Sequence, residues 1–212
     1  RAGRRAGAQQ ADAIDVYEDY RRHFYGCFID DVTGRSRILY LWDQDPPSGT
    51  RGSPPGAVGS YTFDYGIECR QAELGRNGTC ASKDDHPQGH GTHVAGIAAG
   101  DGSGTARGEP SYEYVGVAPE ADLIIVRAEL SSATVADGGA YIFARAEQLG
   151  KPAVVNVSLG SHLSPHDGTA ALSLMLDALS GPGRIIVASA GNGGEAGMGY
   201  PGAYAPVISV AA

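Results

Sequence analysis

Two histidines, His90 and His93, stand in the segment GHGTHVAGIAAG at 89–100 and are the first candidates for chemistry. Imidazole can ligate a metal ion or act as a general base. A zinc-protease helix needs His-Glu-x-x-His, with its ligands four residues apart and a glutamate base between them. Here the spacing is three residues, with Gly91 and Thr92 in between. We therefore expect no metal site and predict that His90 is a general base.

Small residues follow His90 and indicate how it is held. Such residues let a helix lie very close to a sheet, with His90 in the first turn. The alternative, that both histidines are ordinary core or loop residues, leaves this run of small residues without a purpose. The run consists of Gly91, Ala95, Gly96, Ala98, Ala99 and Gly100.

The segment VVNVSLG at 154–160 is the second candidate. A buried strand ending in Ser158, Leu159 and Gly160 opens its backbone at the carboxyl edge of a sheet, where open α/β folds bind ligands. The glycine lets another extended chain pair alongside, which is one way to hold a peptide. Many α/β strands end in this way, so this segment indicates a function only together with the other two candidate segments.

The third candidate is IIVASAGNGG at 185–194, in which a strand leads to Asn192 among glycines. An amide at a strand tip can donate a hydrogen bond to a developing oxyanion. An asparagine in an ordinary left-handed turn would give the same local sequence. If Asn192 is the oxyanion donor, it must converge with His90 on one reacting centre.

Continuous, β-branched apolar runs predict the strands that position these residues. Such runs are typical of strands buried on both faces of a parallel sheet, and the stretches between them have helical spacing. This alternation predicts a doubly wound α/β layer in which the strands at 123–126, 154–157 and 185–188 are neighbours. The predicted strands are 123–126, 154–157, 185–188 and 207–210, and the predicted helices are 135–149 and 169–179.

Each predicted helix has an apolar face, and the front third of the chain has a different pattern. Ile142, Ala146 and Leu149 share the face of the first helix, and Leu172, Met175 and Leu179 that of the second.

Residues 37–42 predict a strand, and 45–59, rich in Pro, Gly and Ser, predict a loop. We expect 35–212 to form one partial domain, preceded by a diverged or mis-read segment at 1–34.

Charge and composition argue against a nucleic-acid-binding protein and against a membrane-spanning helix in this chain. The 212 residues have a formal net charge of −8, and no basic stripe suits a nucleic-acid backbone. No apolar run reaches the roughly 18 residues of a membrane helix. Three cysteines form no disulfide framework, although Cys69 and Cys80 could close a loop; the alternative is free thiols.

Together the three candidate segments resemble the subtilisin-like serine proteases. GHGTHVAGIAAG is similar to that family's histidine motif, VVNVSLG to its substrate-binding strand, and ASAGN at 188–192 to the segment with its oxyanion-hole asparagine. GVAPEADLIIV at 116–126 resembles the strand between them. RILYLWDQ at 37–44, YGIECRQAEL at 65–74 and residues 164–187 are similar to a bacterial branch near the clostridial spore-germination proteases.

The resemblance implies a subtilisin-like three-layer α/β fold, here truncated, with a mainly parallel sheet and helices on both faces. It implies a serine endopeptidase acting on peptides or proteins, with His90 as general base, Asn192 as oxyanion donor and Ser158, Leu159 and Gly160 as the substrate strand. No cofactor is required. Calcium sites are frequent in the family, but no residue here is assigned to one. The family favours a secreted or cell-envelope location.

Two members of the expected triad are not identified in the sequence. The family's Gly-Thr-Ser-Met-Ala motif follows the asparagine at a distance, whereas only twenty residues follow Asn192, and their one serine, Ser209, lies in an apolar run. We expect a fragment that lacks its nucleophile. Asp15, Asp30 and Asp64 compete as the aspartate, which could also be degenerate or missing.

Two other functions compete with the protease. The first is a catalytically inactive subtilase-fold module that binds a peptide or a partner protein; the unassigned aspartate favours it, and His90 and Asn192 oppose it. The second is a nucleotide-binding α/β domain, which needs a glycine-rich loop between its first strand and helix. No such loop is present in the sequence.

Overall fold

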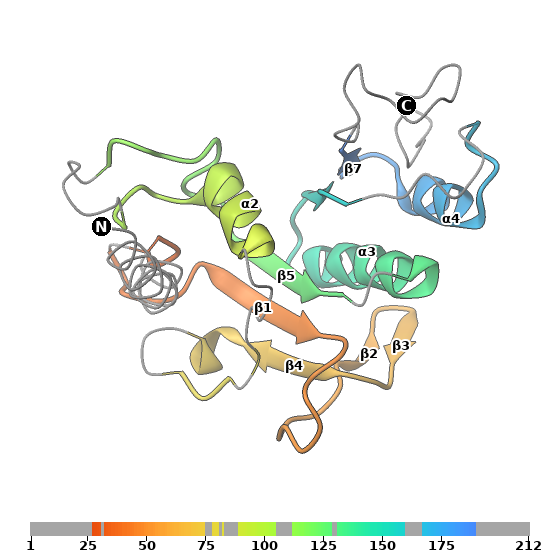
Figure 1. Ribbon diagram of the computed structural model, residues 1–212, viewed down its shortest axis with the longest axis horizontal. Helices are drawn as coiled ribbons and strands as arrows, with labels where there is room; N and C mark the ends of the chain where they lie inside the picture. The colour runs from red at the N-terminus through yellow and green to blue at the C-terminus, as the bar shows by residue number, and fades with distance from the viewer. Residues whose placement is uncertain are drawn as a thin grey trace, which may run out of the picture. The chain divides into compact units, whose positions relative to one another are not determined.

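The structure is a computed structural model (Figure 1), and its residues form two compact units. Unit 1 comprises Arg1–Leu41 and Cys69–Ile125, and unit 2 comprises Trp42–Glu68 and Val126–Ala212. The described residues are 27–30, 32–74, 78–80, 82, 89–104, 112–128, 131–159 and 167–189.

Three strands form a sheet in the order β4-β1-β5. They are β1 (Ile38–Asp43), β4 (Ile67–Arg70) and β5 (Leu123–Arg127), and each crosses a boundary between the units. The first confirms the strand predicted over 37–42. Its apolar side chains Ile38 and Trp42 are fully buried.

Main-chain bonds at the two ends of β1 fix the direction of its neighbour β5. In unit 1 the Leu123 amide donates to the Arg37 carbonyl at 2.8 Å, and in unit 2 the Gln44 amide donates to the Arg127 carbonyl at 3.0 Å. Both strands therefore run the same way, as their arrows show in Figure 1, whereas β4 runs in the opposite direction.

Unit 1 also contains α2 (His90–Ala99) and a short 3-10 helix, η1 (Gln71–Glu73). Cys69, at the end of β4, forms a disulfide with Cys80, which decides between the two alternatives that the cysteines left open. Cys27 is a free thiol, and burial raises its pKa. No helix in the described part of the chain is both long and apolar enough to cross a bilayer.

Unit 2 is built around one long helix, α3. An antiparallel hairpin, β2–β3, packs against it, and so do strand β6 and helix α4 (Figure 1). The predicted loop 45–59 therefore ends earlier, because residues 56–58 form a strand of that hairpin. The elements are β2 (Gly56–Val58), β3 (Tyr61–Phe63), α3 (Ser132–Gln148), β6 (Ala153–Val157), α4 (Ala171–Leu179) and β7 (Arg184–Ala188).

The parallel pairing of β6 and β7 confirms one predicted contact. Val154 stands opposite Ile185 in the β6–β7 ladder, and α4 connects the two strands along the chain. In the described residues β5 pairs with β1. The predicted pairing of β5 with β6 joins residues of different units and stays a prediction. An apolar run predicts a strand, but backbone bonds between distant segments choose its partner.

Within the described residues of unit 2, one face of the β6–β7 pair is buried, whereas the sequence predicted that both are. Val155 and Val157 point inward and are 5% and 6% exposed. On the outer face Val154, Ile185 and Val187 are 64%, 54% and 49% exposed. Alternation of side chains along a strand places these two groups on opposite faces, and α3 and α4 cover only the inner one.

The two predicted helices form, but their buried faces differ from the predicted ones. Ten residues of α3 are buried, all around its axis, because elements pack on several sides of it. On α4, Leu176 is fully buried, whereas Met175, predicted to face the core, is 44% exposed. Leu172 and Leu179 are partly buried against the same cluster, as expected.

A fully buried leucine makes this core testable. Leu176→Ala should lower the free energy of unfolding by about 3 kcal/mol, because the core around α3 cannot collapse completely into the cavity. Leu174→Ala, on the same helix but 56% exposed, should change it by less than about 0.5 kcal/mol. Urea denaturation of the chain measures both. Equal losses would contradict the observed orientation of α4.

A buried polar group in unit 2 predicts a loss of stability at alkaline pH. Burial and then the neighbouring Glu68 carboxylate raise the pKa of Tyr141 well above its usual value of 10.0. The folded state therefore keeps a proton that the unfolded state releases, so this stabilisation is complete below about pH 10 and declines above it.

Tyr141→Phe should remove this contribution. Its free energy of unfolding should fall less steeply than that of the unsubstituted chain above about pH 10, by up to about 1.4 kcal/mol per pH unit. Urea titrations at several alkaline pH values measure the slopes. Tyr61→Phe, at a 41% exposed tyrosine, controls for the loss of a hydroxyl group at neutral pH. Identical slopes for the Tyr141→Phe and unsubstituted chains would contradict the assignment.

Candidate active site

His90 is the first residue of α2, as predicted, and its side chain is exposed. The preceding Gly89 is the N-cap, in a left-handed conformation with φ 57° and ψ 34° that glycine adopts at no steric cost. The Gly89 carbonyl accepts the first helical bond, from the His93 amide at 2.9 Å. An imidazole at this position is open to a reacting group.

The backbone is closely packed at the carboxyl end of α2, the end opposite His90. A Cβ added to Gly91 or Gly96 would meet no described atom within 4 Å, so the sequence-based reason for these two glycines is not observed. A Cβ at Gly100 would lie 2.7 Å from the Gly96 carbonyl oxygen, and one at Gly116 would lie 2.6 Å from the Gly100 nitrogen. Small residues are therefore needed where the helix ends.

Ser158 and Leu159 follow β6 directly, at its carboxyl end, as the sequence predicted. The Ser158 hydroxyl accepts a hydrogen bond from the Asn156 amide group at 2.9 Å. The Ser189 hydroxyl, just after β7, donates to the Leu159 carbonyl at 3.2 Å, and the Ser189 amide donates to Val157 at 3.1 Å. The tips of the two parallel strands are thus tied together.

Asn192 and Gly160 lie outside the described residues. Along the chain, Asn192 comes three residues after Ser189, the residue that contacts Leu159. His90 belongs to unit 1, whereas Ser158 and Leu159 belong to unit 2. The convergence of His90 and Asn192 on one reacting centre therefore stays a prediction.

Asp30, one of the three candidate aspartates, is used by its own turn. Its Oδ1 accepts hydrogen bonds from the Val32 amide and from the Thr33 amide and hydroxyl, at 3.1, 2.6 and 2.7 Å. The hydrogen bonds from Thr33 lower the pKa of the Asp30 carboxyl. This carboxylate therefore closes a turn at the surface.

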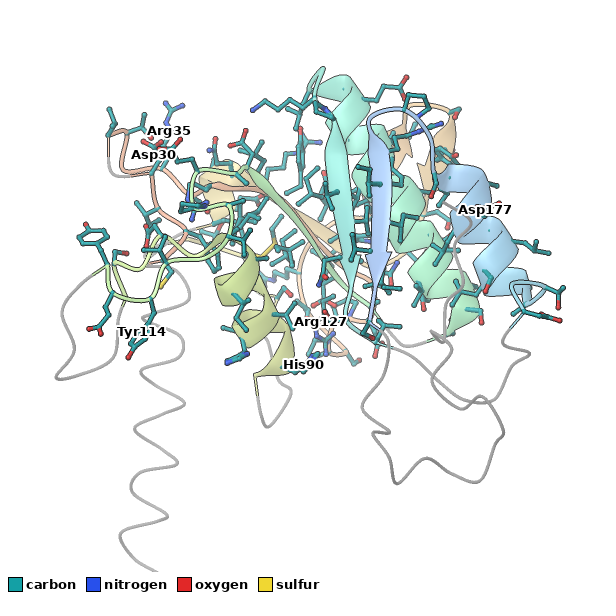
Figure 2. All side chains as sticks on the ribbon, turned by 90° about the horizontal axis from the view of Figure 1, so that it is seen from above. Asp30, Arg35, His90, Tyr114, Arg127 and Asp177 are labelled. Carbon is teal, nitrogen blue, oxygen red and sulfur yellow. A yellow bond between two sulfur atoms is a disulfide. The ribbon has the colours of Figure 1, made fainter. Side chains whose placement is uncertain are left out.

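Asp30 is also far from His90 within unit 1, as Figure 2 shows. The Arg37 amide donates to the Phe28 carbonyl, which places this turn beside the start of β1. The side chain of Arg37 binds the last residue of α2, at the opposite end from His90. Asp15 lies outside the described residues, and Asp64 is exposed directly after β3, in unit 2.

A fourth aspartate, which sequence reasoning missed, lies at the end of β1. Asp43 is fully buried, and its Oδ1 pairs with Arg127 at 2.8 Å in unit 2. The same Arg127 nitrogen donates to the Asp45 carbonyl at 2.5 Å. The sequence did contain a signal for this pair, because Asp43 and Arg127 are charged residues that each end an apolar run. Their geometry is that of a cross-strand ion pair.

In the described ranges, no three His, Cys, Asp or Glu side chains gather as a metal site requires.

Comparison with known proteins decides the family. Residues 66–212 match the subtilase family, and this match covers more than half of the 212-residue chain. The chain belongs to the subtilase family. The family resemblance drawn from the histidine, strand and asparagine motifs is therefore confirmed, whereas the roles of the individual site residues stay predictions.

Several bacterial relatives are similar to this chain. The subtilisin-like protease PopC of Myxococcus xanthus is 36% identical over 144 residues, which cover 59% of this chain and 28% of the relative. A subtilisin of Bacillus sp. (strain TA39) is 37% identical over 155 residues, covering 68% and 34%. Thermitase of Thermoactinomyces vulgaris is 35% identical over 136 residues, covering 60% and 43%. The chain spans less than half the length of these relatives.

One solved structure supports the predicted fold. The CspB protease of Clostridium perfringens superposes with a TM-score of 0.58 at 23% sequence identity, over 82% of this chain and 34% of that chain. The subtilisin-like α/β fold predicted from the sequence is confirmed.

The geometry around Asp30 yields a prediction for the whole protein. Asp30→Asn should leave the rate of peptide hydrolysis within about twofold, because this carboxylate does not reach His90. Removal of a triad aspartate lowers kcat by about 10⁴-fold. Steady-state kinetics with a fluorogenic peptide separates the two results, and a loss of that size would make Asp30 the missing triad member.

Proposed function

We propose that the protein containing this chain is a serine endopeptidase that hydrolyses peptide bonds through an acyl-enzyme. The observation that carries this proposal is the position of His90, exposed at the first residue of α2, in a chain of the subtilase family. The names of the relatives, which include subtilisins and thermitase, support it.

In the proposed mechanism His90 accepts the proton of a serine hydroxyl as that oxygen attacks the scissile carbonyl. The imidazolium then protonates the leaving amine, and water hydrolyses the acyl-enzyme by the reverse sequence of proton transfers. An aspartate fixes the imidazole tautomer. The side-chain amide of Asn192 donates to the tetrahedral oxyanion, which is worth about 3 kcal/mol of barrier. Acyl transfer of this kind needs no cofactor.

The serine of this mechanism is not among the 212 residues. No Gly-Thr-Ser-Met-Ala sequence follows Asn192, and Ser209 stands in an apolar run. The proposed roles of this chain are those of the base, the oxyanion donor and the substrate strand.

The substrate of the proposed enzyme is a peptide or a protein. Ser158 and Leu159 lie at the carboxyl end of β6, beyond its last ladder residue, Val157. Gly160 follows them in the sequence. An extended peptide can pair with such a segment through main-chain bonds, so that recognition depends on the backbone and accepts many side chains.

A second candidate function is an inactive subtilase module that binds a peptide or a partner protein. The observation that favours it is the local hydrogen bonding of Asp30, which removes one candidate for the triad. A gene sequence that lacks the serine motif in the rest of the protein would favour this second function.

Substitutions in the whole protein test the proposed mechanism. His90→Ala should lower kcat by about 10⁶-fold, the effect of removing the base of a serine protease. Asn192→Ala should lower kcat by about 10²- to 10³-fold with little change in KM, because negative charge develops on the carbonyl oxygen only in the transition state and the tetrahedral intermediate. Hydrolysis of a fluorogenic peptide measures both variants.

Two controls accompany these variants. Arg35→Ala, at an exposed side chain, should retain activity. The 212-residue chain alone should not turn over the peptide, since its sequence contains no Gly-Thr-Ser-Met-Ala serine motif. Full activity of the His90→Ala protein would refute the mechanism, and an unsubstituted whole protein that binds peptides without cleaving them would favour the inactive module.

A further inference from the structure

We infer that Arg37 is a positioning residue for His90. It clamps the carboxyl end of α2 to the starts of β1 and β5, and so fixes the helix whose first residue is the base. This inference rests on the proposed function for its catalytic consequence. Its structural part, all within unit 1, can be tested without any activity.

The carboxyl end of α2 is fully bound. The last four carbonyls of a helix have no partner in the regular helical pattern and need one from elsewhere. In α2 each has found one, and three of the four bonds come from outside the helix and its cap. The donors are the Gly100 amide for Gly96 at 2.9 Å, the Val117 amide for Ile97 at 3.0 Å, the Ala118 amide for Ala98 at 2.9 Å and the Arg37 guanidinium for Ala99 at 2.5 Å.

Arg37 connects that helix end to two other parts of unit 1. Its Nη2 donates to the carbonyls of Ala99 and Cys27, and its Nη1 donates to the carbonyl of Ala121 at 2.9 Å. Ala121 stands two residues before β5, and Arg37 itself stands one residue before β1. One side chain therefore holds the end of α2 at the point where two parallel strands begin.

The burial of Arg37 makes this clamp rigid. The residue is only 6% exposed, and its guanidinium lies 5.6 Å from the centre of the Phe28 ring. Its hydrogen-bond acceptors among the described residues are main-chain carbonyls, so the bonds fix the course of the backbone. The positive charge also lies at the negative end of the helix dipole, where it is favourable.

The clamp reaches His90 through the helix itself. α2 has ten residues, and a helix of that length is about 15 Å long and moves as one rigid body. The N-cap of the helix is Gly89, which provides no side-chain cap. A tilt at the bound end is thus transmitted to the imidazole, and a displacement of about 1 Å can cost a catalytic group about 10²-fold in rate.

Arg37→Lys and Arg37→Met separate a positioning role from a general loss of stability. Lysine keeps the charge but cannot reach three carbonyls in the forked geometry of a guanidinium, and methionine keeps only the apolar stem. Arg35→Ala is the matched control, since this arginine is two residues away and exposed. Lysine also serves as the variant that folds if the methionine variant does not.

The first experiment uses the 212-residue chain and needs no catalysis. Amide hydrogen exchange should accelerate at least tenfold at Gly100, Val117 and Ala118 in Arg37→Lys, under conditions in which the whole chain stays folded. The nitrogen resonances of the His90 ring should shift in both Arg37 variants and stay unchanged in Arg35→Ala. A loss of global stability alone would not shift the native-state resonances of a residue at the far end of α2.

The second experiment uses the whole protein. Arg37→Met should lower kcat by about 10- to 100-fold with KM within about twofold, and Arg37→Lys should recover part of that loss. If the unsubstituted protein cleaves no peptide, the proposed function fails while the exchange and resonance results still test the clamp. If Arg37→Lys leaves the exchange rates, the His90 resonances and kcat unchanged, the inference is overturned.

Discussion

Each unit of this protein contains a buried arginine whose terminal guanidinium nitrogens bind groups inside the protein. In unit 1, Arg37 donates to three main-chain carbonyls. In unit 2, Arg145 is 6% exposed and pairs with Glu68, whose carboxylate also accepts a bond from the Tyr141 hydroxyl at 2.7 Å. Because a buried charge without partners is very costly, these contacts hold the surrounding segments in one arrangement.

The core of unit 2 follows from this constraint and from the small residues of α3. A Cβ at Gly138 would lie 3.3 Å from a methyl group of Val126, and one at Gly139 would lie 3.3 Å from a methyl group of Leu179. Glycines at these positions let a strand and a helix approach α3 closely on different sides. Trp42 packs against Tyr141 with ring centres 4.9 Å apart. The helix therefore organises the unit from its centre.

The candidate site draws on the ends of these elements. Ser158 and Leu159 stand where β6 ends, and Ser189 joins them where β7 ends. His90 stands where α2 begins. Strand and helix ends offer exposed backbone groups and side chains on a rigid support, which is what base catalysis and peptide binding both require. The family of the chain gives the residues at these ends their proposed chemistry, peptide-bond hydrolysis.

The sequence by itself determined the kinds of elements, the start of α2 at His90, the strand before Ser158 and the family. These are local properties, since apolar periodicity, glycine positions and a short motif are written in consecutive residues. Only the tertiary structure decided that β5 pairs with β1, that Cys69 bonds Cys80 and that Asp30 closes a turn. It also revealed Arg37, which in the sequence is one basic residue before an apolar run. Most of these features depend on contacts between different segments of the chain. The turn at Asp30 depends instead on which nearby donors bind its carboxylate. The periodicity of apolar residues encodes neither kind of contact.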